Sequence, residues 1–519
     1  MLVGDLVTNN ARRIPESTAL VFEDERPTWR RLDESSNRVA NALIKLGVRP
    51  GDRVTYILGN SVELVELYFG IAKTGAISAG ILPRSVGREI AYIVNDLSAK
   101  VLVVGAEAAP VVAEIQGQLS SVEAIVSVGG DAFLPYEKLL AQASAEAPHV
   151  PIDPDDVFAV KYTTGTTGFP KGCMRTHRGY LTNVLVYLAK VPHLPSDIAC
   201  IGMPLSAGLG IHMLTTHATA GIPTVLRPRF ETGDLLETIA RDRVSITFAL
   251  LSLFDQLVEH PDLADADLSS LRILTGTSAT GDSRPGMLRI KANPTFTGGF
   301  ANSYGSTETG GYVTYMTPAE TDVALLSDAK PDRMSSLGTE APLFRVSAVD
   351  EDMREVPAGE FGEMVVRGPS LTKGYWNRPE DTAKAFRDSW LVTGDLIRKD
   401  QDGFIWLSGR KRDMIKTGGV NVYPAEIEAV LGEHPKIDQI AVIGMPDKRW
   451  GEKVVACIVS RSGCTEADVM DLAARNLAGF KKPKDVLFFD HLPSNEVGKI
   501  VKKDLPALVA ERLGRIGTK

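Results

Sequence analysis

Hydrophobic positions in the first third of the chain follow two alternating patterns. Apolar residues recur at helical spacing between residues 32 and 46, where Gly47 ends the pattern, and again between residues 62 and 72. Short, almost wholly apolar runs lie between and after these two helical segments, at residues 54–58, 76–82, 101–105 and 124–128. Such runs are typical of strands that are covered on both faces. The alternation predicts an α/β fold of mainly parallel sheets with flanking helices.

The pattern changes near residue 410, where residues 409–413 carry four charges. Beyond this point the chain has its own strand and helix candidates, at residues 440–443, 454–459, 465–477 and 486–489. A chain of 519 residues is also too long to fold around a single hydrophobic core. We therefore predict a large N-terminal domain of residues 1–411 and a small C-terminal α+β domain of residues 412–519.

Composition and charge restrict the class of protein. The chain has 44% hydrophobic and 24% charged residues, as in an ordinary globular protein, and its net charge of −8 argues against a general nucleic-acid binder. The four cysteines show no C-x-x-C spacing, which favours neither a zinc site nor a disulfide framework. Asp5 and Arg12-Arg13 interrupt any N-terminal apolar stretch, and the longest apolar run, residues 246–254, is about half as long as a membrane-spanning helix. We expect a cytoplasmic protein without a signal peptide or a transmembrane segment.

The most informative segment is a loop rich in glycine and threonine that follows an apolar run at residues 157–160. Residues 162–172 read Tyr-Thr-Thr-Gly-Thr-Thr-Gly-Phe-Pro-Lys-Gly. Glycines let backbone amides turn towards an anion, hydroxyls add donors and Lys171 adds a positive charge, a combination that suits a polyphosphate. A Walker A loop does not fit, because Pro170 precedes the lysine and Gly172 follows it. A flexible polar loop is the alternative without a function. The predicted phosphate contacts are Lys171 together with Thr163, Thr164, Gly165, Thr166, Thr167 and Gly168.

Four further motifs follow this loop in chain order. They are Tyr-Gly-Ser-Thr-Glu-Thr at 304–309, Trp-Leu-Val-Thr-Gly-Asp at 390–395 with Gly409-Arg410 downstream, Lys-Thr-Gly-Gly-Val-Asn-Val-Tyr-Pro-Ala-Glu-Ile-Glu at 416–428, and Pro-Ser-Asn-Glu-Val-Gly-Lys-Ile at 493–500. In this order the motifs resemble those of the adenylate-forming superfamily, which includes acyl-CoA synthetases, nonribosomal peptide adenylation domains and beetle luciferases. The resemblance covers nearly the whole chain. It implies an ATP-dependent, AMP-forming acid–thiol ligase that is similar to acyl-CoA synthetases.

The resemblance also implies roles for individual residues. Lys499, Lys171 and Glu308 are the implied catalytic residues. Lys499 would bridge the carboxylate of the acid and the α-phosphate of ATP, and Glu308 would hold Mg²⁺, since a carboxylate beside a triphosphate needs a cation between them. Asp395 and Arg410 would grip the ribose. The other implied ATP contacts, beyond the glycine-threonine loop, are Thr277, Ser278, Ala279, Asn302, Ser303, Tyr304, Gly305 and Thr307.

In the same family the small C-terminal domain is mobile and pivots between two half-reactions. Arg412 falls at the hinge, where Asp or Lys is usual, and its charge keeps the hinge solvated. Gly418 and Gly419 fall in the loop that builds the thiol tunnel, where they would let the pantetheine arm of coenzyme A pass close to the backbone.

The chain departs from the family pattern at the acyl site. Many members carry a bulky Pro-Leu-Phe-His-like stretch, where this chain has Ser206 and Ala207. His212 either substitutes for the missing side chain or is a structural residue of an apolar helix. Gly298 and Gly299 would form the opposite wall and suggest depth. No acidic residue stands near Ser206 to bind an amino group, so we expect an apolar acid of medium or longer length, or a bulky ring acid.

The predicted partners are therefore a carboxylic acid, ATP and coenzyme A, with Mg²⁺ as cofactor, and a homo-oligomer is left open. The nearest alternative is an acyl-AMP ligase that loads a carrier protein, although no obvious insertion precedes the small domain. A P-loop kinase or ATPase would release ADP instead of AMP. A luciferase-like oxidase that uses the same adenylate is a further alternative.

Overall fold

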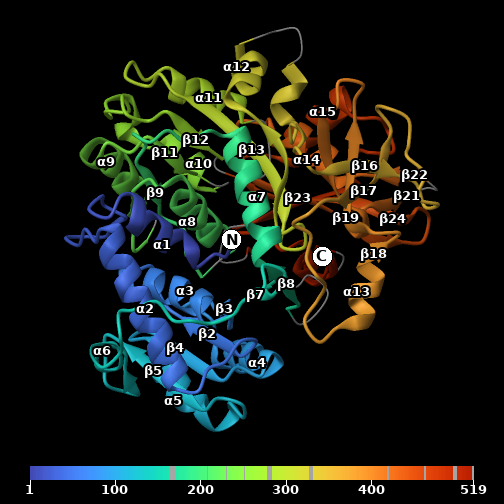
Figure 1. The fold of residues 1–519 in the computed structure, drawn as a ribbon. Helices are drawn as coiled ribbons and strands as arrows, with labels where there is room; N and C mark the ends of the chain where they lie inside the picture. Colours follow the sequence, from blue (N-terminus) through green and yellow to red (C-terminus); the bar gives the residue numbers. More distant parts are fainter. Residues whose placement is uncertain are drawn as a thin grey trace.

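Two large sheets and two smaller ones form the framework of the chain in this computed structural model (Figure 1). The structure describes residues 1–163, 170–206, 208–229, 231–249, 252–276, 283–326, 331–417, 420–460, 463–494 and 500–516. No helix in these ranges is both long enough and apolar enough to cross a membrane.

The first large sheet has seven strands in the order β6-β5-β4-β2-β3-β7-β8. All neighbours are parallel except β7 and β8, which are antiparallel. The strands are β2 (Arg53–Ile57), β3 (Ile77–Gly80), β4 (Val101–Gly105), β5 (Ala124–Val128), β6 (Leu134–Pro135), β7 (Val157–Tyr162) and β8 (Gly172–Thr176). Helices α2 (Trp29–Lys45), α3 (Val62–Lys73) and α6 (Tyr136–Ala141) pack on one face, and α4 (Gly87–Leu97) and α5 (Ala109–Ile115) pack on the other.

The second large sheet has eight strands in the order β1-β10-β9-β11-β12-β13-β14-β15 and is parallel from β1 to β13. The strands are β1 (Leu20–Val21), β9 (Ala199–Ile201), β10 (Thr224–Leu226), β11 (Ile246–Phe248), β12 (Ile273–Thr275), β13 (Gly299–Ser306), β14 (Gly311–Met316) and β15 (Thr339–Glu340). Its outer face is covered by α9 (Thr232–Asp242), α10 (Ser252–Glu259), α11 (Arg284–Lys291) and α12 (Pro318–Leu326). Its inner face is covered by α1 (Asp5–Arg13), α7 (His177–Lys190) and α8 (Gly208–Ala220).

The largest hydrophobic core lies between the two large sheets. It joins β2 of the first sheet to β9 and β10 of the second through α3, α7 and α8. Figure 1 shows α7 running along this junction. Side chains on the inner faces of the two sheets are therefore buried together.

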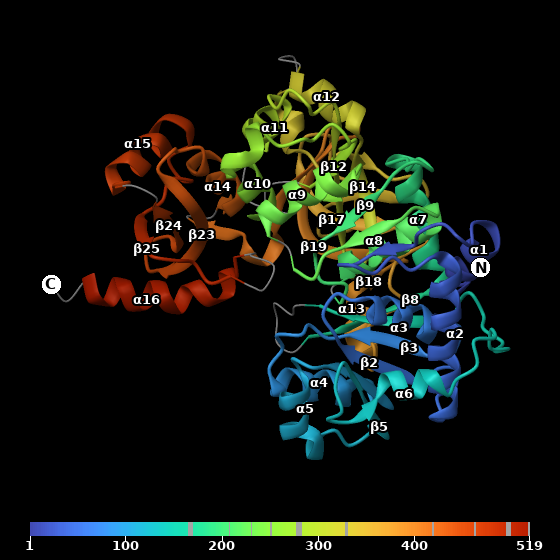
Figure 2. The same ribbon diagram turned by 90° about the vertical axis from the view of Figure 1, so that its left-hand side faces the viewer.

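The two smaller sheets follow in the C-terminal part of the chain. The first contains β16 (Arg345–Val349), β17 (Phe361–Arg367), β18 (Phe386–Arg387), β19 (Trp390–Lys399) and β20 (Ile405–Arg410), with α13 (Pro379–Ala385) beside it. The second contains β21 (Ile415–Thr417), β22 (Val420–Val422), β23 (Ile437–Asp447), β24 (Gly451–Ser460) and β25 (Asp485–Phe489), with α14 (Pro424–Gly432), α15 (Glu466–Asn476) and α16 (Leu505–Ile516). This last group has its own cores and lies to one side of the other sheets (Figure 2).

The predicted fold class is confirmed: large, mainly parallel sheets with flanking helices precede a smaller α+β unit. The four apolar runs near the N-terminus are β2, β3, β4 and β5. The predicted boundary between residues 411 and 412 falls in the short helix η4 (Lys411–Asp413), between the last strand of one sheet and the first strand of the next. The boundary itself stays a prediction.

Candidate active site

The glycine-threonine loop connects β7 to β8, so its two ends lie side by side. Tyr162 is opposite Gly172 in the register of the hairpin. The backbone N–H of Thr163 donates to the carbonyl of Lys171 at 2.9 Å, and the N–H of Lys171 donates to Oγ1 of Thr163 at 3.3 Å. Thr163 and Lys171 therefore close the base of the loop. The predicted contacts between them, Thr164, Gly165, Thr166, Thr167 and Gly168, lie outside the described residues.

A segment from the distant C-terminal part, residues 372–376, lies along the outer edge of β8. The N–H of Trp376 donates to the carbonyl of Gly172 at 2.7 Å. This pairing brings Tyr375 to the loop, where Nζ of Lys171 lies 5.2 Å from the centre of its ring. A cation this close to an aromatic face is attracted by the ring electrons.

Tyr375 also contacts the carboxylate of the second motif. Its OH donates to Oε1 of Glu308 at 3.1 Å, and burial followed by this carboxylate raises the pKa of Tyr375. The carbonyl of Glu308 accepts from the N–H of Thr372 at 2.8 Å. Nζ of Lys171 lies 3.0 Å from Oδ2 of Asp381. One short segment therefore holds Lys171 and Glu308 in the same region.

Glu308 lies in the turn between β13 and β14. The register of these strands shifts between Tyr304 and Gly305. A side-chain carbon on Gly305 would lie 2.1 Å from a backbone oxygen of the opposite strand, so this bulge requires glycine. The carbonyl of Thr307 accepts from Nη2 of Arg175 at 3.5 Å.

The predicted ribose residues face each other across β19 and β20. Asp395 and Arg410 are paired in register, and Nε of Arg410 lies 2.8 Å from Oδ1 of Asp395. The OH of Tyr304 donates to Oδ2 of the same carboxylate, and burial followed by Asp395 raises the pKa of Tyr304. Asp395 is only 3% exposed, whereas the side chain of Arg410 is 41% exposed. The structure thus brings together a buried acceptor, a phenol and an accessible guanidinium.

Asn302 and Ser303 precede Tyr304 on β13. The side-chain amide of Asn302 donates to the carbonyl of Ser336 at 3.2 Å, and its Oδ1 accepts from the N–H of Ser303 at 2.7 Å. Asn302 therefore ties β13 to the segment that leads into β15.

The acyl-site candidates Ser206 and His212 are both buried, His212 beside α7 and β14 and Ser206 beside Gly80 of β3. The ring of His212 lies 5.5 Å from those of both Tyr180 and Tyr312. Neither ring nitrogen of His212, nor Oγ of Ser206, has a hydrogen-bond partner among the described residues. Burial lowers the pKa of His212 to about 3, so this imidazole is neutral at physiological pH. Ala207 lies outside the described residues.

Gly298 and Gly299 are used for close packing of the backbone. A side-chain carbon on Gly298 would lie 2.3 Å from the carbonyl oxygen of Leu271, and one on Gly299 would lie 2.9 Å from Cβ of Pro318. Neither glycine has open space beside it. The prediction that these two positions deepen the acyl site therefore finds no support.

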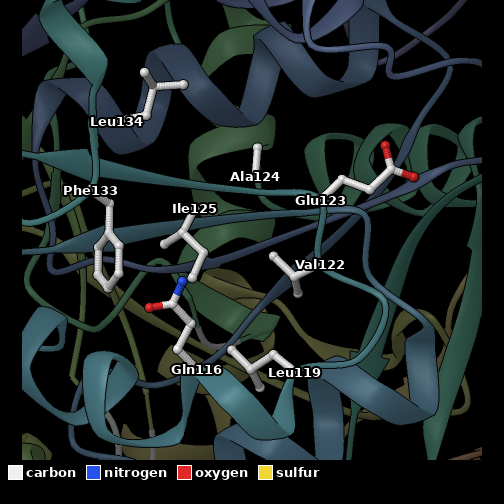
Figure 3. A pocket seen from close by; sticks show the side chains of 8 residues that line it. All are labelled: Gln116, Leu119, Val122, Glu123, Ala124, Ile125, Phe133 and Leu134. Carbon is white, nitrogen blue, oxygen red and sulfur yellow. The ribbon is translucent and has the colours of Figure 1, made fainter.

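The predicted hinge residue, Arg412, is exposed in η4, with its Nε 3.4 Å from Oδ1 of Asp413. It lines a cavity of about 160 Å³ together with Lys502 and Lys503. A second cavity, of about 260 Å³, lies beside β5 at the outer edge of the first sheet, and none of the residues that line it is a predicted site residue (Figure 3). The remaining candidates lie outside the described residues: Thr277, Ser278, Ala279, Gly418, Gly419 and Lys499.

Sequence reasoning missed Tyr375 and Asp381, which contact Lys171 or Glu308. The available signal was the run Gly-Tyr-Trp-Asn-Arg-Pro at residues 374–379, where two aromatic residues stand between turn formers. That run does not show that the segment pairs with β8.

Comparisons with known proteins identify the family. The family described as AMP-binding enzyme matches residues 7–376, and its C-terminal domain matches residues 426–499. An indoleacetate–CoA ligase of Aromatoleum aromaticum is 32% identical over 99% of both chains. A long-chain-fatty-acid–CoA ligase of Mycobacterium tuberculosis is 32% identical over 96% of this chain and 97% of its own. The crystal structure of an anthranilate CoA ligase with anthranoyl-AMP superposes with a TM-score of 0.88 at 28% identity, covering 98% of this chain and 97% of its own.

Proposed function

The chain belongs to the family of AMP-binding enzymes and is an AMP-forming acid–thiol ligase, and from this premise we propose which of its residues carry the reaction. It activates a carboxylic acid with ATP as the acyl-adenylate and then forms the thioester with coenzyme A. The observation that best supports the proposed nucleotide site is the convergence of Tyr304 and Arg410 on the buried carboxylate of Asp395.

We assign the ribose to Asp395 and Arg410. A carboxylate accepts hydrogen bonds from both ribose hydroxyls, and the accessible guanidinium adds donors. Tyr304 would lie against the adenine, with Thr277, Ser278 and Ala279 on the adjoining turn.

We assign the β- and γ-phosphates to the glycine-threonine loop, Lys171 and Thr307. Lys171 is now paired with Asp381 and lies over the ring of Tyr375. Both groups of that ion pair are about one-third exposed, so a phosphate can displace the aspartate at small cost.

Mg²⁺ is the proposed cofactor, and Glu308 is its proposed ligand. Within the described ranges no group of three or more His, Cys, Asp or Glu residues could hold a metal ion. One carboxylate together with phosphate oxygens suits Mg²⁺, which keeps several waters and seldom uses an all-protein cage. When bound, the ion would neutralise phosphate charge, and Tyr375 would orient Glu308 towards it.

Lys499 is the proposed catalytic residue of adenylation, on the basis of its motif. Attack of a carboxylate on the α-phosphate brings two anions together, and an ammonium group between them would stabilise the charge that develops. Pyrophosphate is then released. Residues 412–519 would rotate about Arg412, withdraw Lys499 and present Gly418 and Gly419 to the pantetheine arm, while closure excludes water from the adenylate.

The acid is proposed to be a medium- or long-chain fatty acid or a bulky ring acid. Two relatives are named for indoleacetate and for long-chain fatty acids, which are acids of these two kinds. A cytoplasmic location and a homo-oligomeric state stay predictions.

The test is acid-dependent release of pyrophosphate from ATP, measured with and without coenzyme A over aliphatic and ring acids. We expect AMP as product, rapid turnover only with coenzyme A, and loss of adenylate formation in Lys499→Ala. Adenylate without thioester would instead indicate a carrier-protein thiol, and ADP as product would overturn the assignment.

A further inference from the structure

Two cationic side chains are buried on the inner face of the first large sheet. Lys161 of β7 is 5% exposed and Arg175 of β8 is 7% exposed. The motifs that identify the family assign no role to either residue. Charged side chains this deeply buried are rare unless an anion accompanies them.

The register of the sheet explains why the two cations are neighbours. Ser78 of β3 pairs with Ala159, and Ala159 pairs with Arg175. Lys161 follows Ala159 by two residues and therefore points to the same face. That face is turned towards α7 and α8, because Ala159 belongs to the core between the two large sheets.

Neither cation has an anionic partner among the described residues. No carboxylate there lies within ion-pair distance of Lys161 or Arg175, and Nζ of Lys161 and Nε of Arg175 have no hydrogen-bond partner. Among the described residues the one acceptor of Arg175 is the carbonyl of Thr307, at 3.5 Å. Burial and the charge of Arg175 lower the pKa of Lys161 to about 7.

Further polar groups without partners lie on the neighbouring strand β3, beside it, and on α8. The guanidinium carbon of Arg175 lies 5.5 Å from the centre of the Tyr180 ring, which lies 5.5 Å from that of His212. The charge of Arg175 also reaches His212, because it contributes to the lowered pKa of that imidazole. Ser78, Ser206 and His212 each have a buried polar atom without a partner in the described part of the chain.

We propose that Lys161 and Arg175 form a buried site for a second carboxylate of the acid substrate, so that the enzyme acts on dicarboxylic acids. The proposal rests on the acyl site proposed above, since His212 of that site lies beside the Tyr180 ring that Arg175 also faces. A carboxylate accepts several hydrogen bonds from ammonium and guanidinium groups and would supply the missing negative charge. An inorganic anion has the same chemistry, and the experiment separates the two sources.

The experiment compares acids that differ only by the second carboxylate. Octanedioate is paired with octanoate, and 4-carboxyphenylacetate with phenylacetate, in the pyrophosphate-release assay with coenzyme A. We expect the wild-type enzyme to favour the diacid in at least one pair, by about 10-fold or more in kcat/KM. Lys161→Met and Arg175→Met should each lower the ratio of diacid to monoacid kcat/KM on the order of 10–100-fold.

The controls separate loss of the site from loss of folding. Arg178→Met removes an exposed arginine three residues from Arg175 and should leave the ratio unchanged. Arg175→Lys should recover part of the preference for the diacid. The melting temperature of the wild-type enzyme should rise more with octanedioate than with octanoate, sodium chloride or sodium sulfate, and this difference should disappear in Lys161→Met.

Three results would overturn the proposal. The first is a preference for the monoacid in both pairs. The second is an unchanged ratio of diacid to monoacid kcat/KM in both methionine variants. The third is a rise in melting temperature with chloride or sulfate as large as the rise with the diacid. Turnover of monoacids alone would leave the ligase assignment intact and remove only the second carboxylate. Failure of every acid to release pyrophosphate would remove the proposed function, and the diacid site with it.

Discussion

Lys161→Met should stabilise the enzyme below neutral pH, although the residue is deeply buried. The pKa of Lys161 falls from 10.5 to about 7 in the folded chain. That shift corresponds to about 5 kcal/mol between the two protonation states. Below pH 7 the folded and unfolded chains both carry the charge, so the folded state bears the full cost. Methionine has a similar length and no charge, so this cost disappears.

The pH dependence gives the sign of the effect. Between pH 7 and 10.5 the unfolded chain binds more protons than the folded chain, so the stability of the wild-type enzyme rises with pH in this window. The gain from Lys161→Met should therefore be about 5 kcal/mol at pH 6 and fall by about 3 kcal/mol by pH 9.5. Neighbouring groups keep one protonation state over this range: the pKa of His212 is about 3, and burial raises the pKa values of Tyr56, Tyr180 and Cys173.

The assay is calorimetric melting of the full chain at pH 6.0, 8.0 and 9.5 in the absence of substrates. For a cooperative unit of this size, 5 kcal/mol corresponds to a rise of about 5 °C in the melting temperature. Lys138→Met replaces an exposed lysine and should change nothing at any pH. A melting temperature of Lys161→Met that is lower than wild type at pH 6.0, or a gain that does not shrink at pH 9.5, would refute the reasoning.

Three further substitutions test the site. Asp395→Asn should raise the KM for ATP on the order of 10–100-fold, because it removes the charge that Arg410 faces; an unchanged KM would contradict the ribose assignment. Tyr375→Phe should lower kcat/KM for ATP by about 3–10-fold and raise the Mg²⁺ concentration needed for half-maximal rate. An unchanged Mg²⁺ concentration for half-maximal rate would contradict the role proposed for the hydroxyl of Tyr375. Gly298→Ala should destabilise the protein by about 1–3 kcal/mol without changing which acids are preferred as substrates. The control Gly130→Ala should be neutral, because a side-chain carbon there meets open space. Equal melting temperatures of the two variants would show that the backbone around Gly298 moves to accommodate the methyl group.

The sequence was sufficient to predict the parts of the site that a local motif identifies. The glycine-threonine loop is a connection between two adjacent strands, so its composition already describes its ends, Thr163 and Lys171. Asp395 and Arg410 could be paired as residues of one site from their motifs, although only the register of β19 and β20 shows that they are direct neighbours.

The parts of the site that the sequence could not predict depend on contacts between segments that are distant along the chain. Tyr375 reaches Lys171 because residues 372–376 add to the edge of β8, and no periodicity encodes that contact. Lys161 lies between Val160 and Tyr162, an alternation that is typical of a strand with one exposed face, yet the face that carries Lys161 is covered by α7 and α8. Gly298 suggests depth when only its residue type is known, and only the structure shows that the carbonyl oxygen of Leu271 lies close beside it.

The pairing of residues 372–376 with β8 also affects the order in which the chain can be completed during synthesis. Thr372 donates to the carbonyl of Met174, 198 residues earlier in the sequence. Until the ribosome has released the later segment, β8 presents an unpaired strand edge, which is a template for wrong pairing. Contacts this distant in sequence form slowly. The strand edge beside the glycine-threonine loop would therefore be among the last parts of the nascent enzyme to be protected from wrong pairing. Truncated chains that end before residue 372 should therefore aggregate through this edge.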